Sequence, residues 1–242
     1  MSATGETPSA AAAIALLWER RTTTRRGPRP TLTLEAIAHA GIEIADADGL
    51  AAVTMQHVAT TLGVTKMALY RYVPGKAELV ALMIDAGIGE PPRPAADGWR
   101  PRLDEWSRQM FSKFSRHPWA LEVTVGARAI GPNELGWIEE AVAALDGTGL
   151  DGSEMLDVAA TLAGHVRAMA QQLAATPGER PEQAMQVAMA DLLRGHEERF
   201  PALMAAFSSA ATHGKPDNAL DFGLTVILDG VGLLIAGRAG ER

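Results

Sequence analysis

The chain has 242 residues, of which 47% are hydrophobic and 5% aromatic, and it carries a formal net charge of −7. This length suits one or two domains with a sizeable core, and the apolar content excludes a disordered chain. The sequence has no cysteine, which excludes disulfides, thiolate catalysis and zinc–thiolate sites.

The charge is distributed unevenly along the chain. Residues 1–30 hold five arginines and two glutamates, a net charge of +3, which leaves −10 for the remainder. All five arginines lie in the acid-free run RRTTTRRGPRP, residues 20–30. A basic arm on an acidic body is expected where a protein meets a polyanion, and a solvated tail explains the charge equally well. We predict that residues 1–31 form a flexible basic arm.

Two apolar stretches were considered as membrane segments. Ala10–Trp18 has about half of the ~20 residues that a span needs, and its basic residues follow the apolar run, which is the reverse of a secretory signal. Phe222–Ala236 is interrupted by Asp229 and several glycines. We therefore expect a soluble, cytoplasmic protein with no membrane partner.

After the arm, apolar residues recur with helical spacing, and no segment alternates convincingly with period two. Three threonines, Thr33, Thr54 and Thr65, each precede an apolar stripe at the position of an N-cap. They predict three consecutive helices that begin directly after them. The first helix closes at Asp48-Gly49, the second at Gly63, and the third near Tyr72. A fourth helix begins at Lys76, after Pro74-Gly75.

Residues 87–98 are rich in proline and glycine and indicate a domain boundary. We therefore predict a small domain over residues 32–86 and a larger one over residues 99–242. The larger domain contains longer helical patterns. They are expected within residues 103–114, 119–129, 134–145, 153–173, 181–199 and 220–238.

Residues 54–72 combine a capped helix, a glycine turn and a short second helix with one narrow apolar edge. This is the helix-turn-helix arrangement, in which the second helix enters the major groove by its N-terminal end. Lys66 is able to donate to guanine O6 and N7, and Met67 to meet a thymine methyl group. Basic and hydroxyl side chains nearby suit phosphates. The candidate contacts are Gln56, Thr65, Lys66, Met67, Tyr70, Arg71 and Lys76. An ordinary α-hairpin with a solvated face is the alternative.

Four motifs, ADADGLAAVTM, VATTLGV, ALYRYV and GKAEL, follow one another between Leu32 and about Asp85. In order and spacing they closely resemble the N-terminal DNA-binding domain of the tetracycline-repressor (TetR) family. The segments GWRPRLDEWSRQMFSKFSRHPWALEV and AATLAGHVRAMA resemble the C-terminal domain of the same family.

The resemblance implies an all-α fold with an N-terminal three-helix DNA-binding domain and a larger helical domain for ligand binding and dimerisation. The implied partners are a double-stranded operator, a small-molecule effector and a second copy of the chain. Ligand binding re-spaces the two recognition helices and releases DNA. The helices at 181–199 and 220–238 have broad apolar faces that suit the dimer contact, with a single-chain core as the alternative. Three arginines that precede the helix-turn-helix unit, Arg25, Arg26 and Arg29, are candidates for side chains that enter the adjacent minor groove.

Large apolar side chains and one imidazole of the second domain suit an apolar or amphipathic effector. The candidate ligand residues are Trp106, Met110, Phe114, Trp137, Met155, Leu162, His165 and Met169. An ordinary core is the alternative for each of them. The position that matches the magnesium-binding histidine of the tetracycline repressor falls near Val123–Thr124, where no histidine occurs. We therefore expect no metal, no cofactor and an effector other than magnesium–tetracycline.

Enzymatic interpretations find little support in the sequence. The run GTGLDG, residues 147–152, satisfies G-x-G-x-x-G, but it follows a helical pattern and places Asp151 where a pyrophosphate would lie. The same region fails as a calcium loop because Leu150 takes a ligand position. The leading prediction is a ligand-responsive repressor. The alternative is a small-molecule-binding helical protein, or an enzyme, that does not engage DNA.

Overall fold

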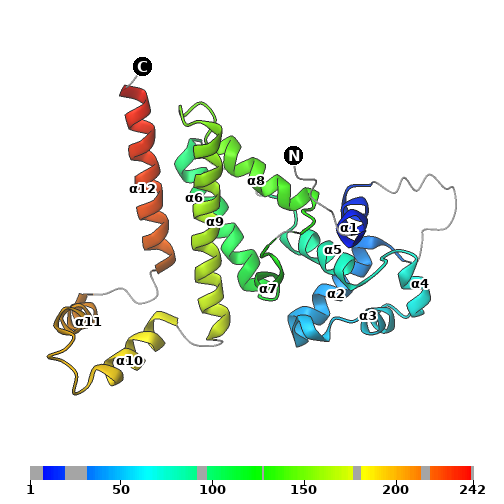
Figure 1. The fold of residues 1–242 in the computed structure, drawn as a ribbon, viewed down its shortest axis with the longest axis horizontal. Coiled ribbons are helices and arrows are strands. Elements are labelled where there is room, and N and C mark those ends of the chain that lie inside the picture. The colour runs from blue at the N-terminus through cyan, green and yellow to red at the C-terminus, as the bar shows by residue number, and fades with distance from the viewer. Residues whose placement is uncertain are drawn as a thin grey trace.

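The computed structural model describes residues 8–19, 32–91, 97–126, 128–176, 181–213 and 219–240. Within these ranges the regular structure consists of α-helices and one 3-10 helix, without strands, which confirms the predicted all-α fold. Figure 1 shows helices α1–α5 on one side of helices α6–α9, with α12 along the opposite side.

A helix that the sequence did not predict, α1 (Pro8–Trp18), lies within the segment expected to be a flexible arm. It packs against α5 (Lys76–Ile88) and buries Ala13. Trp18 Nε1 also donates a hydrogen bond of 2.9 Å to the carbonyl of Ile130. The expectation of flexibility is therefore wrong for residues 8–18. Alanine favours helix, and tertiary packing holds this one in place.

The next four elements are α2 (Leu34–Asp48), the 3-10 helix η1 (Leu50–Ala52), α3 (Met55–Thr61) and α4 (Lys66–Tyr70). All three predicted threonine caps are confirmed. Each threonine hydroxyl accepts the backbone N–H three residues further on: Thr33 from Ala36, Thr54 from His57 and Thr65 from Ala68. These bonds satisfy N–H groups that a helix start leaves without an intrahelical partner.

The central helices are α6 (Trp99–Arg116), α7 (Ala120–Val123), α8 (Pro132–Ala144) and α9 (Gly152–Ala175). The helix predicted over residues 119–129 is wrong in extent, because α7 ends after one turn and Gly126 has a φ of +81°. Helix α9 starts with a capping box between Asp151 and Glu154 and packs against α6, α8 and α12.

The last helices are α10 (Pro181–Leu193), α11 (Pro201–His213) and α12 (Ala219–Gly240). The single helix predicted over residues 181–199 is wrong, because α10 ends at Leu193 and Gly195 has a φ of +84°. Helix α11 was not predicted. Helix α12 packs on α9 and α6, whereas α10 and α11 extend outward from the body (Figure 1).

The helices bury two clusters of apolar side chains. The first cluster spans α2–α5 and continues into the second half of the chain through Phe114, Trp119 and Val166. The second cluster lies among α6, α8, α9 and α12, and includes Trp106, Trp137 and Leu228. Because the first cluster has members from both halves, the N-terminal helices and the ends of α6, α7 and α9 share one packed core.

Candidate DNA-binding surface and effector region

Helices α3 and α4 form the helix-turn-helix unit. The turn between them depends on Gly63, whose φ of +65° is a conformation that side chains with a Cβ rarely adopt. Next to it, the N–H of Val64 donates to the carbonyl of Ala59 at 2.9 Å. The Thr65 cap then starts α4 in a new direction. The sequence thereby fixes the angle at which the short second helix leaves the first.

Helix α4 has a buried side and an exposed side. Leu69 and Val73 are fully buried against the preceding helices. Thr65, Lys66 and Met67, at its N-terminal end, are exposed, and 74% of Met67 is accessible to solvent. A lysine and an apolar side chain at this end of the helix are groups that can contact base edges in the major groove. The structure therefore leaves the predicted base-contacting side chains available.

The other predicted DNA-contacting side chains also lie at the surface. Tyr70 is 39% exposed, and the ammonium of Lys66 lies 5.7 Å from the centre of its ring. Arg71 is exposed. Lys76 is exposed as well, and its Nζ donates to the carbonyl of Leu50 at 3.4 Å. Gln56 on α3 is exposed and donates to Thr60 at 3.3 Å. The predicted minor-groove residues Arg25, Arg26 and Arg29 lie outside the described residues.

Three of the predicted ligand residues lie in the packed core of the second half. Trp106, Trp137 and Leu162 are 3%, 1% and 0% exposed. Both indoles use their N–H groups within the protein: Trp106 Nε1 donates to the carbonyl of Trp137 at 2.8 Å, and Trp137 Nε1 donates to that of Gly89 at 3.0 Å. These bonds satisfy the polar ends of the rings, so packing explains both tryptophans in this conformation.

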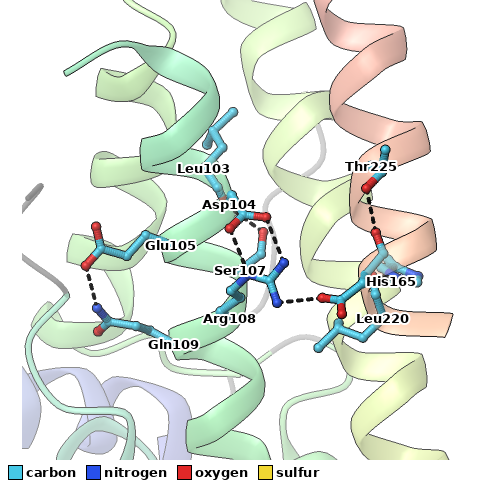
Figure 2. A network of polar contacts seen from close by, with 10 residues as sticks. Leu103, Asp104, Glu105, Ser107, Arg108, Gln109, His165, Leu220 and Thr225 are labelled. Atoms are coloured by element: carbon cyan, nitrogen blue, oxygen red, sulfur yellow. Dashed lines mark hydrogen bonds and ion pairs between the residues drawn. The ribbon is translucent and has the colours of Figure 1, made fainter. Parts of the chain in front are cut away.

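His165 holds the start of α12 (Figure 2). Its Nε2 lies 3.1 Å from the carbonyl oxygen of Leu220, and a Cβ on Gly223 would stand 2.2 Å from the imidazole. Beside it, the Arg108 guanidinium donates to Asp104 at 2.7 Å and to Asp221 at 2.6 Å. Both carboxylates raise the pKa of Arg108, that of Asp104 most. The structure therefore gives His165 a packing role where α9 and α12 approach closely.

The remaining predicted ligand residues are distributed over both clusters. Met110 packs against both, and Met155 packs against the second. Met169 is half-buried on α9. Phe114 is buried and lines a narrow apolar cleft between α5 and the end of α6. Of the eight predicted residues, only Phe114 lines this cleft.

Two carboxylates that were not predicted from the sequence join the halves of the chain. Asp46 on α2 accepts hydrogen bonds from His117 Nδ1 and from Trp119 Nε1, both at 2.8 Å. Asp85 on α5 caps α8, because its Oδ1 accepts from the N–H groups of Asn133 and Glu134 at 2.9 and 3.2 Å. For Asp85 the available signal was an acidic residue within the otherwise apolar part of its helix, whereas Asp46 lies near Glu43 and Asp48 and gave no such signal.

Asp85 is a buried carboxylate in a confined position. Burial raises the pKa of its carboxyl group, and the two hydrogen bonds from the backbone of α8 partly offset this effect. A Cβ on Gly131 would stand 2.1 Å from Asp85 Oδ1, so only glycine fits there. The start of α8 is therefore held directly against α5.

Among the described residues, no three side chains of the types that ligate metals come close enough to share an ion. Helix α12 is long and apolar enough to cross a membrane by length and composition over Ala219–Arg238, and 17% of that window is buried. Core helices of soluble proteins and signal sequences meet the same criterion, so one such helix is weak evidence for a membrane span.

A threonine-capped helix-turn-helix unit that shares its core with a larger helical body defines a class of DNA-binding transcription regulators. Residues 33–83 match the bacterial regulatory proteins of the tetR family, and residues 91–234 match the tetracyclin repressor-like C-terminal domain. The chain therefore belongs to the TetR family of transcription regulators. Members of this family act by binding DNA and are not enzymes.

Individual relatives agree with this assignment. The HTH-type transcriptional repressor DrrR1 of Streptomyces coeruleorubidus is 36% identical over 238 residues, covering 93% of this chain and 87% of the relative. An HTH-type transcriptional regulator of Saccharopolyspora erythraea is 28% identical over 209 residues, covering 86% and 88%. The structure of ActR from Streptomyces coelicolor in complex with actinorhodin has a TM-score of 0.68 at 26% identity, covering 84% of this chain and 96% of that one.

Proposed function

We propose that two copies of the chain bind a palindromic operator and repress transcription until a small, largely apolar effector releases them. The observation that carries this proposal is the surface of α4. Its apolar side is buried through Leu69, while Lys66 and Met67 project from its capped N-terminal end. That end of a helix-turn-helix unit enters the major groove, where lysine reads guanine and an apolar group meets the thymine methyl.

The neighbouring side chains position α4 on the duplex. Tyr70, Arg71 and Lys76 lie beside the exposed end of the helix, where phosphate contacts fix orientation without reading sequence. Gln56 on α3 is a further candidate for a base contact. The arginines at positions 25, 26 and 29 add charge ahead of the unit, and we propose that they enter the adjacent minor groove.

The exposed apolar faces of the last helices support a dimer. On α12, Phe222, Val226 and Leu233 are 66%, 53% and 76% exposed, while Leu224 and Leu228 face the body. On α10, Met185 and Leu192 are 59% and 70% exposed. A row of exposed apolar side chains along one side of a helix, as on α12, is typical of an interaction site. A second copy that covers it places two α4 helices on one duplex and explains the apolar character of α12 without a membrane.

An effector is proposed from the relatives and from the core. ActR is a TetR-family protein solved in complex with actinorhodin. We propose that this chain likewise binds a small apolar or amphipathic compound in its second half. Magnesium–tetracycline is a poor candidate, since by the family resemblance the metal-binding histidine of the drug repressor falls near Val123–Thr124, where this chain has no histidine. Micromolar binding of magnesium–tetracycline by calorimetry would refute this part.

Fluorescence anisotropy with the promoter DNA beside the encoding gene tests the function. Lys66→Ala should weaken binding and relax sequence choice, with a loss of about 1–3 kcal/mol on the specific site. Lys76→Ala should weaken specific and random duplexes alike and reduce the salt slope by about one. Identical behaviour of both variants on both duplexes would contradict the contact assignment. Absence of binding by the wild-type protein would favour the alternative of a protein that does not engage DNA.

A further inference from the structure

The narrow cleft at the junction of the two halves adjoins the side chains that hold α2. It lies between α5 and the end of α6, and the walls come from both elements and from the start of α7. The main lining residues are Ile84, Ile88, Lys113, Phe114, His117 and Trp119. Its surface is almost entirely apolar, and it has room for little more than a water molecule. A larger occupant therefore has to move part of the wall.

Two of the lining side chains are also the donors to Asp46. His117 Nδ1 and Trp119 Nε1 each lie 2.8 Å from Asp46 Oδ1. His117 and Trp119 are 9% and 3% exposed, and because both bonds are short, displacing either ring from the wall of the cleft breaks its bond to Asp46. We call these three residues the Asp46 anchor. Because Asp46 belongs to α2, the anchor ties the end of α6 to the DNA-binding helices.

Lys113 gives the cleft its chemical preference. Among the described residues, no carboxylate or carbonyl accepts a hydrogen bond from its ammonium, and it does not take part in an ion pair there. Its Nζ lies 3.5 Å from the position that a Cβ would take on Gly89, close to the end of α5. An ammonium at the edge of an apolar cleft favours a ligand with a flat apolar body and one anionic group.

We infer that this cleft is the effector site, that its ligand is an anionic aromatic compound, and that ligand entry acts on DNA binding by breaking the Asp46 anchor. This inference rests on the proposed function. The anion pairs with Lys113, and the ring system enters beside Phe114 and displaces His117 and Trp119. Once Asp46 loses its donors, the polar contact between α2 and the end of α6 is lost, and the apolar core that α2 shares with Phe114 and Trp119 is left as their connection.

The ligand class is tested with two fluorescent probes that differ in one group. 8-Anilinonaphthalene-1-sulfonate carries the required anion, and N-phenyl-1-naphthylamine has the same rings without it. Lys113→Met should weaken binding of the sulfonate about tenfold or more and leave the neutral probe unchanged. Arg116→Met, an exposed basic residue near the end of the same helix, is the matched control. Equal sulfonate affinity in the wild-type protein and Lys113→Met would overturn the assignment.

Gly87→Ala tests the position of the site without the risk of unfolding. A Cβ at this helical glycine would stand 3.7 and 3.8 Å from Trp119 and His117, which is ordinary van der Waals contact. The variant should raise Tm by about 2–4 °C, because alanine favours helix. It should also weaken sulfonate binding, because the methyl group fills the cleft. Gly152→Ala, whose Cβ would meet nothing within 4 Å, should not change probe binding. A stabilised Gly87→Ala variant with unchanged probe affinity would place the ligand elsewhere.

The coupling step is tested on operator DNA with and without saturating sulfonate probe. The probe should weaken operator binding by the wild-type protein about fivefold or more. In Asp46→Ala the ratio of operator affinity without probe to that with probe should approach one. Asp48 is an exposed carboxylate at the end of the same helix, and Asp48→Ala should keep the wild-type ratio. An unchanged ratio in Asp46→Ala would overturn the coupling. Failure of the wild-type protein to bind the operator would instead reject the proposed function, and the Lys113 test of the ligand class would still stand.

Discussion

The carboxylate of Asp85 shows how one residue connects two elements that are far apart in the sequence. It is 8% exposed, and its charge is balanced by two backbone N–H groups at the start of α8. Replacement by asparagine keeps an acceptor oxygen at the same place and removes the buried charge. Replacement by alanine removes the acceptor and leaves both N–H groups without it. The two variants therefore separate the hydrogen bonds from the charge.

We expect Asp85→Ala to lower the free energy of unfolding by about 1–3 kcal/mol, and Asp85→Asn to leave it unchanged or higher. Chemical denaturation followed by circular dichroism measures both. Because burial raises the pKa of Asp85 in the folded state, the folded protein binds this proton more tightly than the unfolded chain. Wild-type stability should therefore decrease as the pH rises through that folded-state pKa, and Asp85→Asn should flatten this dependence. Equal destabilisation by both substitutions would show that the charge itself is required.

Individual helices differ in how far the sequence determines them. Those of the N-terminal half were predicted because local signals agree: a threonine cap precedes each apolar stripe, and Gly63 ends α3. Helix α1 was missed because it has neither a cap signal nor a polar face, and its position depends on contact with α5. The break after Leu193 was missed although Gly195 is a signal for a helix end and residues 194–199 hold no apolar side chain that would continue the pattern.

The functional side chains show the same division. The surface of α4 could be predicted, since exposure on a short capped helix follows from periodicity. The ligand residues were harder to predict, because Trp106 and Trp137 look the same in sequence whether they line a cavity or fill a core. Their burial in the second cluster and the hydrogen bonds of their indoles place them in the core. Asp46 and His117 are 71 residues apart, so their contact depends on tertiary structure.

The cap of α4 leads to a prediction at the level of the element. Helix α4 has only five residues, so the hydrogen bond from Ala68 N–H to Thr65 Oγ1 contributes a large part of the stability of its first turn. Thr65→Ala should lower stability by about 1 kcal/mol and weaken operator binding, and Thr65→Ser should restore both. Anisotropy and denaturation curves measure the two effects. Thr61→Ala, at an exposed hydroxyl that does not cap a helix, is the control. Serine failing to rescue would assign the effect to the lost methyl group.

At the level of the whole molecule, the distribution of apolar surface on α12 requires an explanation. One side of the helix is fastened to the body by Leu224 and Leu228 and by ion pairs of Asp221 with Arg108 and of Asp229 with Arg100, both at 2.6 Å. The other side exposes large apolar groups along the same helix. The proposed dimer accounts for this stripe, because a second copy covers it and also supplies the second α4 that the proposed palindromic operator requires.

Leu233→Glu tests this arrangement, because Leu233 is 76% exposed within the proposed interface. An unpaired carboxylate in an apolar contact should weaken dimerisation at least about 100-fold, which sedimentation velocity detects, and operator affinity should fall with it. Val125→Glu, at a 66% exposed valine between α7 and α8, should leave the dimer intact. Flotation with anionic vesicles distinguishes a membrane contact from a dimer contact. If the wild-type protein floats with the vesicles and Leu233→Glu does not, the apolar stripe binds lipid. A wild-type monomer that stays in the aqueous phase would leave the stripe uncovered and remove the structural basis for binding two half-sites.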